Sequence, residues 1–183
     1  MPTACFTGHR RINGAYYNYQ TPTLDWLHLR DRMLEVVLAF ATTSMEVNEF
    51  ISGMAIGVDQ LAAECVLLTR THEGLDLALT AAIPFPSQPS NWPINTQERY
   101  YWLLGQAQAQ IISPDPYTPA KMHVRDRWMV DNSNYVIAIW DGRKQGGTYA
   151  TLTYAVQTGK PIFWINPLLD PIEGAWFDNV NLI

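Results

Sequence analysis

Residues 134–159 read NYVIAIWDGRKQGGTYATLTYAVQTG, and this stretch decides the fold. Tyr135 to Trp140 form a continuous apolar run with β-branched residues in its middle, which is typical of a strand buried on both faces. Gly146, Gly147 and Thr148 then lead into a helical segment that Gly159 closes. A buried strand, a glycine loop and a helix in this order indicate a parallel sheet covered by helices.

The same alternation of short apolar runs and longer helical segments extends through the rest of the chain. Apolar runs predict strands over residues 3–8, 47–53, 75–85, 109–114, 134–142 and 160–166. Helical segments are predicted over residues 21–44, 58–70, 95–107, 119–133 and 146–159. Because helices join nearly all of the strands, we expect one α/β domain over residues 1–183 with a mostly parallel sheet of about six strands. No structure is assigned to the tail over residues 167–183.

The segment over residues 21–44 has the pattern of a long amphipathic helix. Thr21 is expected to cap its start, with Pro22 in the first helical position. The face expected to be buried carries Trp26, Leu29, Met33, Val36, Val37 and Phe40. Further along the chain, four prolines between residues 84 and 93 predict a rigid loop around Trp92.

Composition and charge limit the class of protein. Of the 183 residues, 48% are apolar and 16% charged, which suits a globular domain with a full core. The net charge of −5 provides no global attraction for a polyanion, so any contact with nucleic acid must be local. Cys5 and Cys65 lack metal-ligand spacing, which indicates reduced thiols and a cytoplasmic location. Neither a signal peptide nor an apolar run of the roughly 20 residues needed to span a bilayer is recognised, so we expect no membrane partner.

The stretch SGMAIGVDQLAAE, residues 52–64, contains the first candidate ligand site. Ser52 and Gly53 end a predicted strand, Gly57 precedes a predicted helix, and Asp59 lies in its first turn. The free N–H groups at the start of a helix, together with its dipole, favour a phosphate or carboxylate at such a place. The alternative is a tight turn in which Asp59 caps the helix and no ligand binds.

Two further loops follow predicted strands. Thr7 and Gly8 close the first strand, and His9 and Arg10 come just after it, where an arginine fork suits phosphate. The alternative for this loop is a solvated surface turn. In the second loop, Asp141 lies at the end of the strand predicted over residues 134–142. The next helix begins at Gly146, Gly147 and Thr148, which are the other candidate ligand residues of this loop.

The segment HVRDRWM, residues 123–129, places Arg125 and Met129 on one helical face. We expect Arg125 to reach the ligand, whereas Arg127 and Asp131 are better explained as a solvated pair. Among the aromatic residues, Trp92 is the best candidate for stacking on a base. Three others at helical spacing are expected in the core: Tyr101, Trp102 and Trp128.

Together, CFTGHR, SGMAIGVDQLAAE, RDRWMVDNSNYVIAIWDG and QGGTYATLTYA resemble the SLOG superfamily over residues 3–166, and its YpsA-like branch most closely. The superfamily also contains the DprA/Smf and Lonely Guy proteins. The resemblance implies a Rossmann-like, three-layer domain that binds a nucleotide-derived ligand across its glycine loops. SGMAIGVD matches the DprA loop at Ser52, Gly53, Gly57 and Asp59. The Lonely Guy elements RKxxM and PGGxGT match at Arg125, Met129, Gly146, Gly147 and Thr148.

One departure from the Lonely Guy pattern concerns catalysis. Those enzymes have a glutamate three residues after the matching threonine, and Thr151 occupies that position here. Cleavage of an N-glycosidic bond builds positive charge on the ribose, which a carboxylate stabilises and a hydroxyl does not. Asp141 or Asp59 are the acids to consider instead, so no catalytic residue is assigned. No metal or other cofactor is assigned either, because the histidines are scattered.

The sequence favours a cytoplasmic binder of a nucleotide-like small molecule, acting as a sensor or in nucleotide metabolism. The second hypothesis is DprA-like binding of single-stranded nucleic acid through Lys121, Arg125, Arg127, Arg143 and Lys144. An N-glycosidic hydrolase with a non-standard acid and a scaffold with vestigial loops are further alternatives. The aromatic tail GAWFDNVNLI, residues 174–183, would suit either a homo-oligomer contact or core packing.

Overall fold

Seven strands of the described residues form one sheet in the order β6-β5-β4-β1-β7-β8-β9. The computed structural model describes residues 1–177. Every neighbouring pair is parallel except β8 and β9, which are antiparallel. The strands are β1 Thr3–Gly8, β4 Glu49–Ser52, β5 Ala78–Ile83, β6 Gln108–Ile111, β7 Tyr135–Ile139, β8 Ile162–Ile165 and β9 Gly174–Trp176. The predicted α/β class with a mostly parallel sheet is therefore confirmed.

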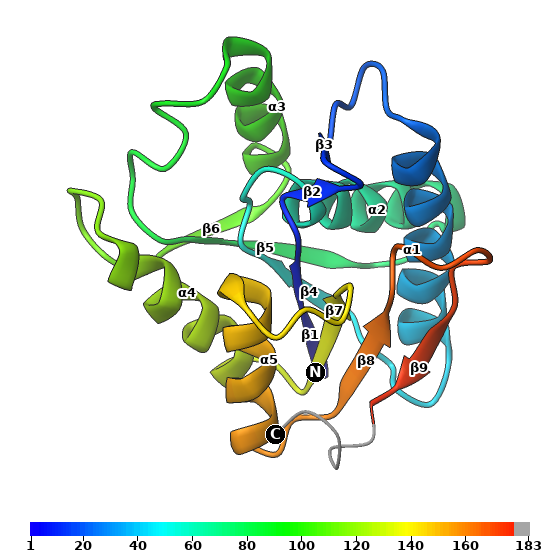
Figure 1. Ribbon diagram of the computed structural model, residues 1–183. Coiled ribbons are helices and arrows are strands. Elements are labelled where there is room, and N and C mark those ends of the chain that lie inside the picture. The colour runs from blue at the N-terminus through cyan, green and yellow to red at the C-terminus, as the bar shows by residue number, and fades with distance from the viewer. Residues whose placement is uncertain (178–183) are drawn as a thin grey trace.

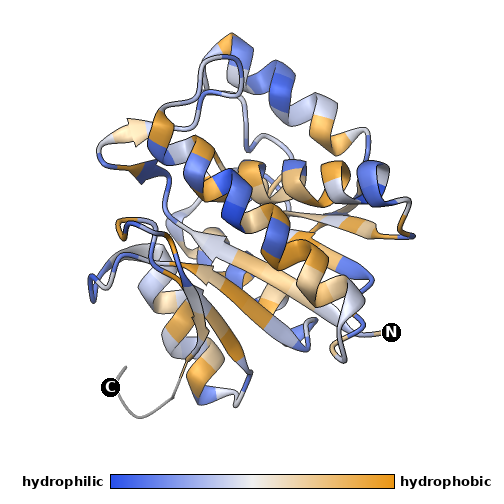
Figure 2. Cartoon of the chain, turned by 90° about the vertical axis from the view of Figure 1, so that its right-hand side faces the viewer, coloured by the Kyte–Doolittle hydropathy of each residue, from blue (hydrophilic) through white to orange (hydrophobic). Residues whose placement is uncertain are grey.

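Helices cover both faces of this sheet, which gives the three predicted layers (Figure 1). The helices are α1 Leu24–Thr42, α2 Val58–Glu73, α3 Ile94–Leu104, α4 Pro119–Asp131 and α5 Gly146–Gln157. The first three helices share one hydrophobic core with the sheet, and α4 and α5 enclose a second core on the opposite face. Figure 2 shows apolar colour along most of the central strands and alternating colour along the helices. None of these helices is long and apolar enough to cross a membrane.

The long helix α1 buries the predicted face but begins later than expected. Its six predicted apolar residues are all buried. The N-cap is Thr23 rather than Thr21, so Pro22 lies outside the helix. Thr23 has the extended backbone of an N-cap. Several polar residues precede Leu24 and are of a type that suits an N-cap, so the sequence alone does not single out Thr23.

Some elements differ from the sequence-based expectations. The two short strands β2 Arg11–Ile12 and β3 Ala15–Tyr16 form a hairpin around Asn13 and Gly14, both with positive φ. In α3, Tyr101 and Trp102 are 56% and 52% exposed, so the expected core role of these two residues is wrong. The residues of α3 that face the core are instead Tyr100 and Leu103, three positions apart.

The order of the strands reverses at the centre of the sheet. From β1, the chain continues through β4, β5 and β6 on one side, and β7 and β8 lie on the other side. The loops that follow β1, β4 and β7 consequently leave the sheet at neighbouring carboxyl ends. In open parallel sheets, ligands bind in the crevice at this switch point.

Candidate functional site

A cleft of about 280 Å³ opens at the carboxyl end of β1. The strand forms its floor, α4 forms one wall, and the starts of α2 and α5 lie on its two sides. The lining residues are Cys5, Phe6, Thr7, Gly8, His9, Arg10, Ala55, Ile56, Asp59, Met122, His123, Arg125, Asp126, Met129, Gly147, Thr148 and Thr151. We call this the main cleft.

The main cleft collects most of the side chains predicted from the sequence. It contains Thr7, Gly8, His9, Arg10, Asp59, Arg125, Gly147 and Thr148. Six predicted residues do not line it: Ser52, Gly53, Gly57, Gly146, Trp92 and Asp141. Trp92 lines a second cleft, which shares Arg10 with the main cleft. Asp141 lines a third cleft, which shares His9 with the main cleft.

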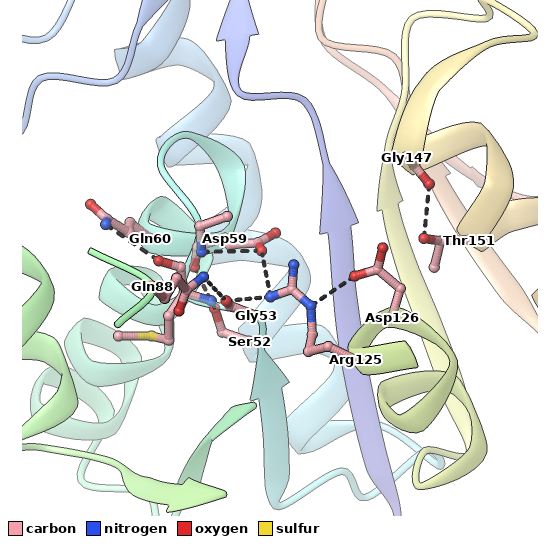
Figure 3. Close-up of polar contacts among 11 residues, drawn as sticks. Ser52, Gly53, Asp59, Gln60, Gln88, Arg125, Asp126, Gly147 and Thr151 are labelled. Carbon is pink, nitrogen blue, oxygen red and sulfur yellow. Dashed lines mark hydrogen bonds and ion pairs between the residues drawn. The ribbon is translucent and has the colours of Figure 1, made fainter. Parts of the chain in front are cut away.

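Arg125 joins the two sides of the main cleft through a buried charge cluster (Figure 3). Its guanidinium donates to the carbonyl oxygen of Gly53 through Nη1 and to Oδ1 of Asp126 through Nε, at 2.8 Å in the second case. Oδ2 of Asp59 lies 3.6 Å from Nη1. The side chain is only 4% exposed, so its donors already serve groups of the protein. A buried arginine needs such partners, so Arg125 supports the cleft. It also lines the main cleft, and its contact with a ligand stays a prediction.

Asp59 is the most strongly perturbed carboxyl of the cluster. Burial raises the pKa of Asp59 to about 6, although Arg125 acts to lower it. Its Oδ2 accepts a hydrogen bond from the N–H of Ala55 at 3.3 Å. The N–H of Val58, in the first turn of α2, donates to the carbonyl of His9 at 3.1 Å. N–H groups at the start of α2 thus donate to groups of the protein itself. This agrees with the alternative in which the loop is a tight turn that binds no ligand.

Three of the glycines make room for the chain itself. A Cβ at Gly53 would lie 1.6 Å from Nη1 of Arg125, and one at Gly8 would lie 2.5 Å from Val58. Gly57 has a φ of +102°, and a Cβ there would lie 2.6 Å from the backbone of Arg10. These glycines are required by close packing between β1, α2 and α4. Of the three, Gly8 also lines the main cleft.

The start of α5 differs from the start of α2. Neither Gly146 nor Gly147 would bring a Cβ within 4 Å of another group, and both residues are exposed. The N-cap Gln145 makes no side-chain hydrogen bond to the helix. The hydroxyl of Thr151 donates to the carbonyl of Gly147 at 2.9 Å and is therefore not an acceptor for an N–H group of the first turn through that bond. An anion can therefore approach this helix start directly.

Arg10 is the uncommitted cation of the main cleft. It is exposed, and within residues 1–177 its guanidinium has neither a hydrogen bond nor an ion pair. Arg10 and Arg125 together balance Asp59 and Asp126 when both carboxyls are ionised. The positive end of the cleft is therefore set by Arg10 and the start of α5, whereas on the α4 side Arg125 and Asp126 form an ion pair.

His9 and Asp141 tie the ends of β1 and β7 together. The N–H of Asp141 donates to Nε2 of His9 at 3.1 Å, and burial lowers the pKa of His9, so the imidazole is the neutral acceptor. Burial acts to raise the pKa of Asp141, but hydrogen bonds from Arg143 outweigh it and hold the pKa below its usual value. Both oxygens of Asp141 accept from Arg143, at 3.1 Å and 2.6 Å. Nε2 of His9 also lies 3.1 Å from Oδ1 of Asp141, and His9 lines the main cleft.

The sequence analysis missed Asp126, Met122 and His123 as residues of the cleft. Met122, Arg125, Asp126 and Met129 follow the i, i+3, i+4, i+7 spacing of one helical face, and this spacing could have revealed them. In Figure 3, Asp126 points from α4 toward Thr151 on α5. A carboxylate therefore faces the cleft opposite the position where the motif has lost its glutamate.

Comparisons with known proteins show the family of this chain. A family model described as the YspA SLOG family matches residues 4–167. The chain is 31% identical over 164 residues to the SPbeta prophage-derived protein YoqJ of Bacillus subtilis (strain 168), covering 81% of this chain and 92% of that protein. It is 30% identical over 171 residues to UPF0398 protein YpsA of the same strain, covering 90% and 92%.

Among solved structures, a DNA-binding protein has a similar fold. It is DNA processing protein A from Helicobacter pylori, described by its single-stranded DNA binding mode, with a TM-score of 0.61 at 19% identity. The match covers 89% of this chain and 64% of that chain, so this protein spans about two thirds of its neighbour's length. At this identity the likeness concerns the fold alone.

Proposed function

This chain belongs to the YspA SLOG family, and we propose that it binds a nucleotide or nucleotide-derived small molecule in the main cleft, as a cytoplasmic sensor or nucleotide-metabolism protein. The family was predicted from the motifs and is confirmed. The ligand's phosphate would lie between Arg10 and the first turn of α5. The observation that carries the proposal is the meeting of an uncapped helix start and an uncommitted arginine in one cleft at the switch point.

The energetics require more than a phosphate contact. Two or three charge-assisted hydrogen bonds contribute about 1.5–3 kcal/mol each, while association costs roughly 4–15 kcal/mol. The ligand must therefore make further contacts. Asp126 lines the main cleft, and its carboxylate is suited to accept hydrogen bonds from ribose hydroxyls.

A thermal-shift screen with nucleoside mono- and diphosphates and dinucleotides tests the proposal. A ligand at a hundred times its dissociation constant adds about 2.7 kcal/mol, which is about 5–10 °C in Tm for a chain of this size. In Gly147→Ala the new Cβ enters the open space beside the α5 start, so the Tm shift should disappear while the unliganded Tm stays close to that of the wild type. The matched control Gly105→Ala changes the C-cap of α3, where a Cβ meets ordinary contacts of 3.5 Å, and it should keep the shift. No Tm shift with any nucleotide would contradict the proposal.

Single-stranded DNA binding is the second candidate, favoured by the fold likeness to the Helicobacter pylori protein. The basic residues expected to serve it are largely engaged: Arg125 is buried, Lys121 donates to the carbonyls of Pro114 and Pro116, and Arg143 pairs with Asp141. Anisotropy of labelled oligo-dT at 50 and 200 mM salt separates the two candidates. Affinity that falls steeply with salt would support DNA binding, because each neutralised phosphate contributes about −0.7 to the slope.

Cleavage of an N-glycosidic bond is the third candidate, favoured by the position of Asp126 in the main cleft. A carboxylate there could stabilise the positive charge on ribose C1′ while water attacks it and the base leaves. Chromatography of AMP after incubation with the protein would detect free adenine. Release by the wild type and its loss in Asp126→Asn would support this activity, and no release would exclude it for AMP.

A further inference from the structure

A second cleft of about 250 Å³ lies next to the main cleft. Arg10 and Met122 line both of them, so the two clefts adjoin at these side chains. The other walls of the second cleft come from the proline-rich loop after β5 and from the segment before α4. They include Phe85, Gln88, Trp92 and Tyr117. We call this the aromatic cleft.

Neither cleft alone has the size of a typical ligand site. Ligand pockets usually measure about 300–1,000 Å³, and each of these clefts is at or below the lower limit. A ligand of nucleotide size must therefore extend from one cleft into the other. Arg10 and Met122 would lie beside the middle of such a ligand.

The aromatic cleft presents rings in fixed orientations. Trp92 is half-buried and packs edge-on against Tyr100, with ring centroids 5.5 Å apart at 88°. Its carbonyl accepts from the amide of Gln97 at 2.8 Å, which fixes the loop to α3. Tyr117 is 56% exposed and lies tilted against Phe85 at 5.3 Å. Rings held in this way lose little entropy when a flat group stacks on them.

Gln88 supplies a hydrogen-bonding group in the aromatic cleft. Its Nε2 donates to the carbonyl of Gly53 at 3.1 Å, which fixes the orientation of the amide. The side-chain oxygen is buried and has no hydrogen-bond partner among the described residues. Buried acceptors without a partner are rare in proteins, so a donor from a ligand would explain this one. The exocyclic amino group of adenine or cytosine is such a donor.

We propose that the aromatic cleft binds the nucleobase of the ligand, with the phosphate in the main cleft. This inference rests on the proposed function and narrows it to nucleoside phosphates whose base carries an amino group. Sugar phosphates without a base should bind only weakly. Arg10 then lies between the two parts of the ligand, where it can contact the phosphate.

Isothermal titration with AMP and with ribose 5-phosphate tests the inference. The wild type should bind AMP about tenfold more tightly than ribose 5-phosphate, because stacking of one base on aromatic side chains contributes at that level. Tyr117→Ala should reduce this ratio several-fold and leave the affinity for ribose 5-phosphate unchanged. The matched control is Tyr101→Ala, since Tyr101 is also 56% exposed and has a similar ring contact, to Tyr100 at 5.2 Å, but lies outside the aromatic cleft. It should behave as the wild type.

The outcomes separate the inference from the proposed function. Equal affinities for the two probes, or an equal loss of both in Tyr117→Ala, would overturn the base site while the phosphate site stands. A ratio that falls equally in Tyr101→Ala would also overturn it. Failure of both probes to bind would remove the proposed function and the base site together.

Discussion

The guanidinium of Arg125 shows how a single buried side chain can shape a site. It reaches from α4 to the carbonyl of Gly53 and to the carboxylates of Asp59 and Asp126. Removing one partner from such a buried cluster leaves a charge without compensation, which is strongly destabilising. The cluster thus fixes α4 and α2 on opposite sides of the main cleft, with Asp126 turned toward the open space.

Gly53→Ala should destabilise the protein by about 2–4 kcal/mol, because the new Cβ would overlap the Arg125 guanidinium. Urea denaturation measures the change. Gly147→Ala, where a Cβ meets open space, should change the free energy of unfolding by less than about 0.5 kcal/mol. Equal effects of the two substitutions would show that the contact between Gly53 and Arg125 does not exist in solution.

Asp59→Asn should alter how stability depends on pH. Burial raises the pKa of Asp59 from 3.8 to about 6, so the folded protein holds this proton more tightly than the unfolded chain. The resulting stabilisation is complete below about pH 4 and is lost as the pH rises to about 6, at about 1.4 kcal/mol per pKa unit. In Asp59→Asn this loss is absent.

Urea denaturation between pH 4 and pH 7 measures this difference. The stability of Asp59→Asn relative to the wild type should rise across that range and then stay constant. Asp141→Asn is the control, because the pKa of Asp141 is lowered below 3.8 and its stabilisation is lost only below about pH 4. The stability difference between Asp141→Asn and the wild type should therefore stay nearly constant between pH 4 and pH 7. A stability difference between Asp59→Asn and the wild type that is independent of pH would mean that Asp59 is not buried as described.

At the scale of elements, the sequence predicted those whose pattern is local and strong. The run from Tyr135 to Trp140 yields β7, and the glycines after it mark the start of α5. The hairpin of β2 and β3 was missed, although Asn13-Gly14 is a strong signal for a tight hairpin turn. In α3 several aromatic residues are adjacent, so the periodicity of a short helix could not show which of them face the core.

The tail provides a prediction at this scale. Trp176 on β9 contacts the rings of Phe40, Tyr135 and Phe163, which supports core packing for this part of the tail; residues 178–183 lie outside the described chain. Trp176→Ala should cost about 1–3 kcal/mol in the free energy of unfolding, less than for a fully buried tryptophan because the residue is 49% exposed.

The matched control is Trp102→Ala. Trp102 is similarly exposed, at 52%, but its described ring contact is with the guanidinium of Arg99. Its removal should cost about 0.5–1 kcal/mol. A loss of unfolding free energy in Trp176→Ala as small as in this control, together with a change in oligomeric state, would show that the tail forms a subunit contact instead.

At the scale of the whole molecule, the fold determines which loops meet. The sequence correctly placed the candidate loops at the carboxyl ends of parallel strands, and the switch point between β1 and β7 brings several of them into one cleft. The sequence could not show at which glycines other side chains of the protein occupy the space that a Cβ would need. The contact between Gly53 and Arg125 joins residues 72 positions apart, and only the packed structure reveals it.

The central claim is that an anionic ligand binds where α5 begins, beside Arg10. Backbone amide shifts of the ¹⁵N-labelled protein during a titration with AMP test this claim most directly. The account predicts the largest shifts at Gly146, Gly147 and Thr148, with Arg10 and Trp92 also affected. Shifts confined to the start of α2, or to surfaces away from both clefts, would contradict it.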